Sequence, residues 1–236
     1  MIKNTWQAVP GHPEIQVGQY IVPNFVSNSI AIQCNENEYI LISPGEPLIE
    51  NWKQLFPPQA KLHIVFPNAY HHLGVKAWLK LFPDTQLYAS KLAISQLHKK
   101  GFENTSILAL EVNPPPLPND FYLRFPPGHR AGDVWVGKHS KESGDLWITC
   151  DSVLNYARVS NQPIARFLQK CLGAAPGLKI SQVVKWFILN DRQAFKHWAL
   201  QQLAQDKPTT LIPSHGEVKT DKSLLSQLEN LLKSRL

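Results

Sequence analysis

The spacing of hydrophobic residues divides the chain into strand-like runs and helix-like stretches. Strands are predicted where β-branched and aromatic residues follow one another in short runs bounded by turn residues. These runs are residues 20–26, 29–34, 39–42, 62–66, 87–89, 121–125, 134–137, 146–149 and 209–212. Residues 35–37 predict a hairpin turn, whereas residues 43–45 and the proline-rich residues 113–118 interrupt the pattern.

Helices are predicted for residues 74–82, 90–100, 163–172, 180–189, 192–205 and 222–236. In the three stretches between residues 163 and 205, apolar residues recur three and four positions apart. Ser90, Asp191 and Asp221 are predicted N-caps. Because strand-like and helical stretches interleave without a linker or an internal repeat, the pattern predicts one layered α/β domain over residues 1–236, with helices outside the sheets.

The composition is that of a globular protein, with 43% hydrophobic and 18% charged residues. The formal net charge is +6, but the basic residues form no long cluster, which argues against a specific nucleic-acid partner. The three cysteines form no CxxC pair, and no apolar run approaches the ~18 residues of a membrane span. We therefore expect a cytoplasmic protein without a membrane partner, either a monomer or a homodimer.

Four loops each place a candidate metal ligand directly after an apolar run. In chain order they contain the pair His71 and His72, then His129, Asp151 and His215. Imidazole nitrogens and carboxylate oxygens are ligands that zinc and related ions favour. The gaps of 57, 22 and 64 residues between His72, His129, Asp151 and His215 exclude a zinc finger, whose ligands come in close pairs. Any one loop alone is explained equally well by a turn or capping residue, so the prediction of a metal site depends on all four.

The order of these motifs resembles that of the metallo-β-lactamase-fold superfamily over nearly the full chain. Residues 71–74 look like the end of its His-x-His-x-Asp-His-x-Gly signature, and residues 125–132 resemble its Pro-Gly-His loop. Residues 147–151 resemble its strand leading to a metal-bridging aspartate, and residues 212–216 its closing His-Gly loop. The resemblance implies a four-layer αββα sandwich. The Asn-x-x-His-His-Leu pattern from residue 68 is similar to that of an uncharacterised branch of the superfamily, for which no substrate is implied.

The sequence departs from the family pattern in its first motifs. Ser43 stands where the first turn usually has Asp. The first two histidines of the signature are missing, and Asn68 and Tyr70 lie nearby instead. His71 stands where an aspartate usually binds metal and often transfers a proton. The site that the resemblance implies is therefore degenerate.

Carried over by position, His71, His72 and His215 would form one metal position together with Asp151. The other position keeps only His129 and Asp151. Because two ligands hold a metal weakly, we expect one well-occupied divalent ion rather than two. Zinc is the first expectation, with iron or manganese as alternatives.

The resemblance implies a metal-dependent hydrolase, because a catalytic zinc lowers the pKa of its bound water to about 7. A metal-bound hydroxide would then attack an ester, thioester, amide or phosphodiester of a small molecule. Tyr70, His71 and Asp151 are the candidate catalytic residues, and Asn68 is a further candidate for polarising the substrate. Two alternatives remain open at this point: a non-catalytic binding protein that has lost part of the dinuclear site, and a dioxygenase-like redox role with iron.

Overall fold

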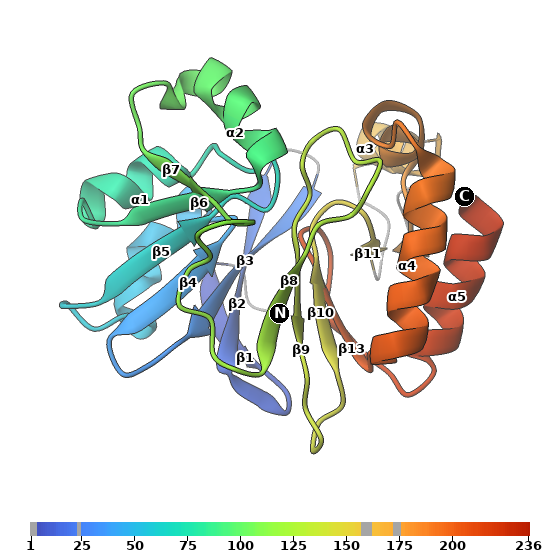
Figure 1. The fold of residues 1–236 in the computed structure, drawn as a ribbon, viewed down its shortest axis with the longest axis horizontal. Helices are drawn as coiled ribbons and strands as arrows, with labels where there is room; N and C mark the ends of the chain where they lie inside the picture. Colours follow the sequence, from blue (N-terminus) through green and yellow to red (C-terminus); the bar gives the residue numbers. More distant parts are fainter. Residues whose placement is uncertain (1–3, 23–24, 157–161, 172–175) are drawn as a thin grey trace. The chain divides into compact units, whose positions relative to one another are not determined.

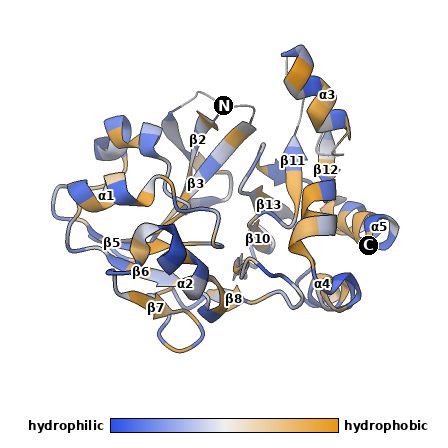
Figure 2. Cartoon of the chain, turned by 90° about the horizontal axis from the view of Figure 1, so that it is seen from above, coloured by the Kyte–Doolittle hydropathy of each residue, from blue (hydrophilic) through white to orange (hydrophobic). Residues whose placement is uncertain are grey.

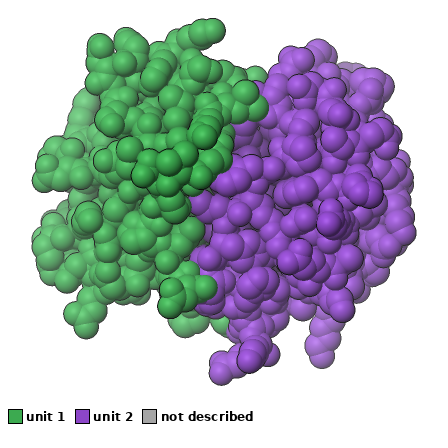
Figure 3. All heavy atoms as spheres, viewed as in Figure 1, with its two compact units in different colours: residues 1–22, 26–119 green, residues 23–25, 120–236 purple. Residues whose placement is uncertain are grey.

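The computed structural model describes residues 4–22, 25–156, 162–171 and 176–236 (Figure 1). The chain divides into two compact units, which Figure 3 colours separately. Unit 1 comprises residues 1–22 and 26–119, and unit 2 comprises residues 23–25 and 120–236. Each unit has its own sheet and its own helices, so the two are described in turn.

Unit 1 contains a sheet whose strand order follows the chain order. Within the described residues this sheet has seven strands, antiparallel from β1 to β2 and from β3 to β4, and parallel from β4 to β7. The strands are β1 (Thr5–Val9), β2 (His12–Val22), β3 (Phe25–Gln33), β4 (Glu38–Ile42), β5 (Lys61–Val65), β6 (Gln86–Ala89) and β7 (Ile107–Ala109). The parallel half is strongly apolar, as expected for strands that helices cover.

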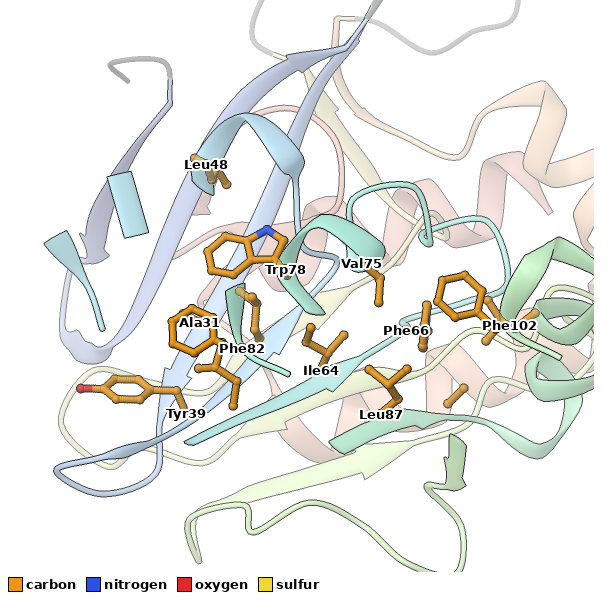
Figure 4. Packing of buried hydrophobic residues seen from close by; sticks show 14 of the residues in the cluster. Ala31, Tyr39, Leu48, Ile64, Phe66, Val75, Trp78, Phe82, Leu87 and Phe102 are labelled. Carbon is orange, nitrogen blue, oxygen red and sulfur yellow. The ribbon is translucent and has the colours of Figure 1, made fainter. Parts of the chain in front are cut away.

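The helical segments of unit 1 connect these strands and pack on the sheet. They are η1 (Glu46–Gln54), α1 (Val75–Leu81), α2 (Lys91–Leu97) and η2 (His98–Phe102). Trp78 of α1 lies at the centre of the core and is fully buried (Figure 4). Its ring stacks on Phe82 with 6.2 Å between centroids and meets the edge of Phe56 at 5.9 Å. The Trp78 Nε1–H donates to the Gly45 carbonyl at 3.0 Å, which ties α1 to the turn after β4.

Unit 2 contains a five-stranded sheet in the order β14-β13-β10-β9-β8, counted over the described residues. Its strands are β8 (Phe121–Arg124), β9 (Trp135–Lys138), β10 (Leu146–Thr149), β13 (Thr210–Pro213) and β14 (Lys219–Thr220). A separate hairpin pairs β11 (Leu154–Tyr156) with β12 (Gly177–Lys179). The helical segments are α3 (Pro163–Cys171), η3 (Val184–Ile188), α4 (Arg192–Asp206) and α5 (Leu224–Arg235), of which α4 and α5 lie side by side (Figure 1).

A buried carboxylate fastens the end of α4 to the sheet of unit 2. Asp206 accepts two hydrogen bonds from the Arg124 guanidinium, at 2.6 and 2.8 Å. It also accepts from the Tyr122 hydroxyl at 2.6 Å and from Trp147 Nε1 at 2.8 Å. The side chain of Asp206 is fully buried and that of Arg124 is 14% exposed, so the ion pair is shielded from water. Such a network fixes the position of α4 over β8 and β10.

Most predicted elements are confirmed, including the turn at residues 35–37 and the N-caps Ser90 and Asp191. The predicted strand 20–26 is wrong as one element, because β2 ends at Val22 and β3 begins at Phe25. Its residues 23–24 lie outside the described part of the chain, as does residue 172 of the predicted helix 163–172.

Three helix predictions need correction. The α-helix predicted for residues 90–100 ends at Leu97, where the π-helix η2 begins. Within residues 180–189 the helical part covers residues 182–188 and is a π-helix over η3. It ends before Leu189, which forms a bridge with His129. Asp221 does not cap α5, which begins at Leu224. The Asp221 carboxylate instead accepts from the backbone N–H of Ser223, the residue directly before the helix.

The mixed α/β class with more than one sheet is confirmed. The extent of the domain, predicted as residues 1–236, stays a prediction. Among the described residues, no helix is both long and apolar enough to cross a lipid bilayer.

Candidate metal centre

Asp151 and His215 lie together because the strands that precede them are parallel neighbours. β10 pairs with β13 so that Thr149 stands opposite Pro213. Each candidate ligand follows two residues later, and its loop leaves the sheet at the same edge. Asp151 Oδ1 is 3.2 Å from His215 Nε2, and both side chains are partly exposed, at 19% and 23%. The sheet therefore presents a carboxylate and an imidazole at one accessible point.

The loop that carries His215 is held by the backbone of Asn155. The Asn155 N–H donates to the His215 carbonyl at 3.3 Å, and the Glu217 N–H donates to the Asn155 carbonyl at 2.7 Å. The Asn155 side-chain amide donates to the Glu217 carbonyl at 2.8 Å. Gly216 has φ +95°, and a Cβ there would clash with the Asn155 carbonyl. Only glycine fits this position, so the imidazole of His215 is presented by a rigid loop.

His129 is placed differently, in a buried polar cluster of unit 2. His129 is 3% exposed. Its Nε2 lies 3.1 Å from Asp133 Oδ2, but neither ring nitrogen forms a hydrogen bond with a described residue. Ser152 Oγ donates to the same Asp133 oxygen at 2.7 Å, and Trp135 Nε1 donates to Ser152 Oγ at 3.2 Å. Asp133 is a residue that the sequence analysis missed, although a carboxylate four positions after His129 was its signal.

Two further side chains lie in the electrostatic field of Asp151. Burial raises the pKa of the Cys150 thiol well above its usual value, and Asp133 and Asp151 add to the effect. Burial is also the main cause that raises the pKa of the Tyr156 phenol, and the negative charges of Asp151 and Glu217 raise it further. Both groups therefore stay protonated at neutral pH.

In unit 1, the loop after β5 carries His71 against the turn after β4. His71 Nδ1 is 2.7 Å from the Ser43 hydroxyl, and Ser43 has a left-handed backbone with φ +54°. A Cβ at Gly74 would clash with the Pro44 carbonyl, so the loop and the turn pack backbone to backbone. A histidine ligand usually has its second ring nitrogen held by such a partner. The Ser43 contact therefore orients the His71 ring so that Nε2 is the nitrogen suited to coordination.

His72 lies in a basic environment within the same loop. Partial burial lowers its pKa, and the charges of Lys100, His71 and Lys76 lower it further. The neutral imidazole is the form that binds a metal. Tyr70 is 45% exposed, and Lys100 Nζ lies 4.5 Å from the centre of its ring. These contacts keep His72 uncharged and place a cation over the predicted catalytic tyrosine.

Asn68, predicted as a group that polarises substrate, shapes the loop. Its side-chain oxygen accepts from the Tyr70 N–H at 2.7 Å, and its carbonyl accepts from the His71 N–H at 3.4 Å. Asn68 is fully buried. Asparagine commonly forms such turns with the backbone two residues on.

A second cluster of one histidine and two aspartates lies elsewhere in unit 2. The candidate donor atoms of His139, Asp145 and Asp206 lie within 4.8 Å of one another. Asp206 already accepts from Arg124, Tyr122 and Trp147, so its charge is neutralised within the protein. This group is an ion-pair network that supports the fold.

Comparison with known proteins identifies the fold. The sequence matches no family model and no curated protein at a significant level. Solved structures do match. A metallo-β-lactamase from Pontibacter korlensis is 16% identical, with 98% of this chain and 100% of that chain covered and a TM-score of 0.57. A diflavin flavoprotein fragment from Nostoc is 14% identical over 98% of this chain and 96% of that chain, with a TM-score of 0.65. The chain has the metallo-β-lactamase fold.

A flavodiiron core from Synechocystis also has this fold and is 14% identical to the chain, with a TM-score of 0.63. The match covers 98% of this chain, which spans 60% of that core. The metallo-β-lactamase fold predicted from the order of the motifs is thus confirmed. At these identities the likeness concerns the fold alone. The ligand set His71, His72, His129, Asp151 and His215 stays a prediction, for which the pairing of Asp151 with His215 is the direct structural support.

Proposed function

We propose that the chain is a metal-dependent hydrolase of the metallo-β-lactamase fold, acting on an ester, thioester, amide or phosphodiester of a small molecule. The observation that carries the proposal is the contact between Asp151 Oδ1 and His215 Nε2 at the ends of two parallel strands. Ligands on adjacent strand ends are rigid and partly exposed, as an ion that must also reach a substrate requires.

The chemistry of the donor groups fits a single divalent ion. Asp151 supplies one negative charge, and His215 supplies an imidazole. The order of the motifs supports His71 and His72 as the further ligands of the same ion. Ser43 orients His71, and the lowered pKa of His72 favours its neutral, ligating form. His129 with Asp151 would form a weaker second position.

A divalent ion held by these residues would polarise a substrate carbonyl or phosphoryl group and acidify a bound water. The protein's own groups would position the substrate and exclude water. Tyr156 would remain a neutral hydroxyl near the charge of Asp151, and the cation of Lys100 over Tyr70 would attract an anionic substrate. Zinc is proposed first and iron or manganese next, because all three accept imidazole and carboxylate ligands. A cytoplasmic location is part of the proposal.

Metal analysis of the purified protein tests the proposal. We expect about one ion per chain in the wild type, and a loss of most of it in Asp151→Ala and His215→Ala. His139→Ala is the matched control, because His139 is an exposed histidine paired with Asp145 outside the proposed ligand set. A wild-type protein that remains metal-free after purification with added zinc or iron would refute the proposal. Retention of metal by Asp151→Ala would refute the ligand assignment.

Activity is tested on a panel of ester, thioester, amide and phosphodiester substrates. Hydrolysis should be abolished by a chelator, restored by the metal, and absent from Asp151→Ala. A metal-loaded protein that consumes oxygen instead would favour the iron-dependent redox alternative, and a metal-free protein would favour the non-catalytic one.

A further inference from the structure

An unusual amount of apolar side-chain surface is exposed on two helical segments of unit 2. On α3, Ile164, Phe167 and Leu168 are 76%, 66% and 46% exposed. On η3, Trp186 and Phe187 are 58% and 66% exposed. Together with Val183, these residues are half of the large apolar side chains that the described chain exposes. Monomeric soluble proteins rarely leave so many large apolar groups uncovered on neighbouring stretches of sequence, so this surface requires an explanation.

The apolar residues of α3 follow one helical face. Ile164, Phe167, Leu168 and Cys171 stand at intervals of three and four residues. Figure 2 shows hydrophobic and hydrophilic residues side by side along α3. Among the described residues, α3 makes no extensive contact with another helix or strand. A helix of nine residues is marginal by itself in water, so α3 gains most from a surface that covers its apolar face.

The charged residues in the stretch of sequence that contains α3 and η3 are all basic. Between residues 152 and 190 the chain contains five arginine or lysine residues and no aspartate or glutamate. This accounts for most of the formal net charge of +6. Lys170 stands between Leu168 and Cys171 in the sequence of α3, and Lys185 and Arg192 lie 5.5 and 4.2 Å from the centre of the Trp186 ring. Cations therefore lie over the exposed ring of Trp186, and basic residues stand next to the apolar residues in the sequence of α3.

We propose that α3 and η3 bind the surface of an anionic lipid bilayer. Helices that lie in a membrane interface combine apolar residues such as Phe, Leu and Trp on one face with Lys and Arg on the other. Tryptophan favours the level of the headgroups, where its ring is partly apolar and partly wet, and each nearby cation is attracted to anionic lipid. The proposal departs from the expectation of no membrane partner, which rested on the absence of a membrane span. Surface binding requires no such span.

Charge favours a lipid surface over a second copy of the chain. Two copies joined through this surface would bring together two stretches that each contain basic but no acidic residues, and like charges oppose association. An anionic bilayer supplies both the apolar interior and the negative charge. The proposed membrane surface is independent of the metal ligands, so it does not rest on the hydrolase proposal.

Co-sedimentation with vesicles tests the proposal. The full chain is mixed with vesicles of phosphatidylcholine alone or with added phosphatidylserine. We expect binding to the anionic vesicles that weakens as salt is raised. Lys170→Ala should weaken the partition about fivefold, and Phe167→Ser about tenfold or more. Leu92→Ser is the control, because Leu92 is a 53% exposed leucine on α2 of unit 1.

The outcomes separate a lipid surface from the alternatives. Because Phe167 is exposed, Phe167→Ser should keep the circular dichroism spectrum and the melting temperature of the wild type. Wild-type protein that binds no anionic vesicles would overturn the proposal, and so would equal binding by Phe167→Ser and wild type. Self-association in solution that Phe167→Ser abolishes would also overturn it, and would assign the surface to a second copy of the chain.

Discussion

Asp206 and Asp151 are both aspartates of unit 2, yet their replacement should have opposite consequences. Asp206 is fully buried and accepts four hydrogen bonds, from Arg124, Tyr122 and Trp147. In Asp206→Ala the guanidinium of Arg124 would stay largely buried without its counter-charge. We therefore expect Asp206→Ala to destabilise the protein without loss of metal. Asp151→Ala should lose metal with little loss of stability, because its side chain is partly exposed.

The expected magnitude follows from the burial of the ion pair. Removal of one partner of a buried pair costs about 3–5 kcal/mol. That is a large part of the roughly 5–15 kcal/mol by which native proteins are stable. For a chain of this size each kcal/mol shifts the melting temperature by about 2–4 °C, so Asp206→Ala should melt roughly 6–20 °C below the wild type. The double variant Arg124→Met with Asp206→Leu should recover part of this loss, since it leaves no unpaired charge.

Thermal unfolding followed by circular dichroism, with urea titration as a second measurement, provides the assay. Metal content is measured on the same samples. A loss below about 1 kcal/mol in Asp206→Ala would refute the reasoning, because that is the range of an exposed pair. A double variant as unstable as Asp206→Ala would refute the role of the uncompensated guanidinium. Loss of metal from Asp206→Ala would mean that the carboxylate serves the metal centre.

Three further predictions follow from individual contacts. Ser43→Ala should weaken metal binding about 10- to 100-fold in a competition titration, because His71 loses the partner of its Nδ1. Gly216→Ala should lower both the melting temperature and the metal content, since the new Cβ would clash with the Asn155 carbonyl. Hydrogen bonds from Lys61 and His63 lower the pKa of Glu38 from 4.5 to about 2. This stabilisation is complete above about pH 4.5 and is lost as the pH falls towards 2. Glu38→Gln should therefore make the free energy of unfolding, measured by urea titration, less dependent on pH over that range. An unchanged pH dependence would contradict the assignment.

The elements that depend on local sequence were predictable. Ser90 accepts from the Ala93 N–H and Asp191 from the Ala194 N–H, as their positions before helical stretches indicated. The parallel strands β4, β5, β6, β10 and β13 were visible as apolar runs, whereas the parallel strand β7 was not predicted. The π-helix η3 was not, because an apolar repeat of three and four residues does not distinguish it from an α-helix.

The candidate site was predictable only in part. The sequence identified Asp151 and His215 because each follows an apolar run, and the parallel register then brings them together. The spacing of four residues between His129 and Asp133 was a signal, but their proximity depends on the conformation of the loop that joins β8 and β9. The part played by Asn155 in holding the His215 loop likewise arises from residues far apart in the chain.

The tight packing around Gly74 and Gly216 has a consequence for the history of the chain. Each glycine faces a backbone carbonyl, of Pro44 and Asn155 respectively, that no change of rotamer can move away. Selection for folding alone would retain both residues, whether or not a metal is still bound. Histidines and carboxylates that serve only a metal have no such protection. In a lineage that loses the metal-dependent reaction, the ligands would be substituted first and these glycines last. The two glycines therefore indicate common descent of the fold, whereas the histidines indicate that the metal site is still in use.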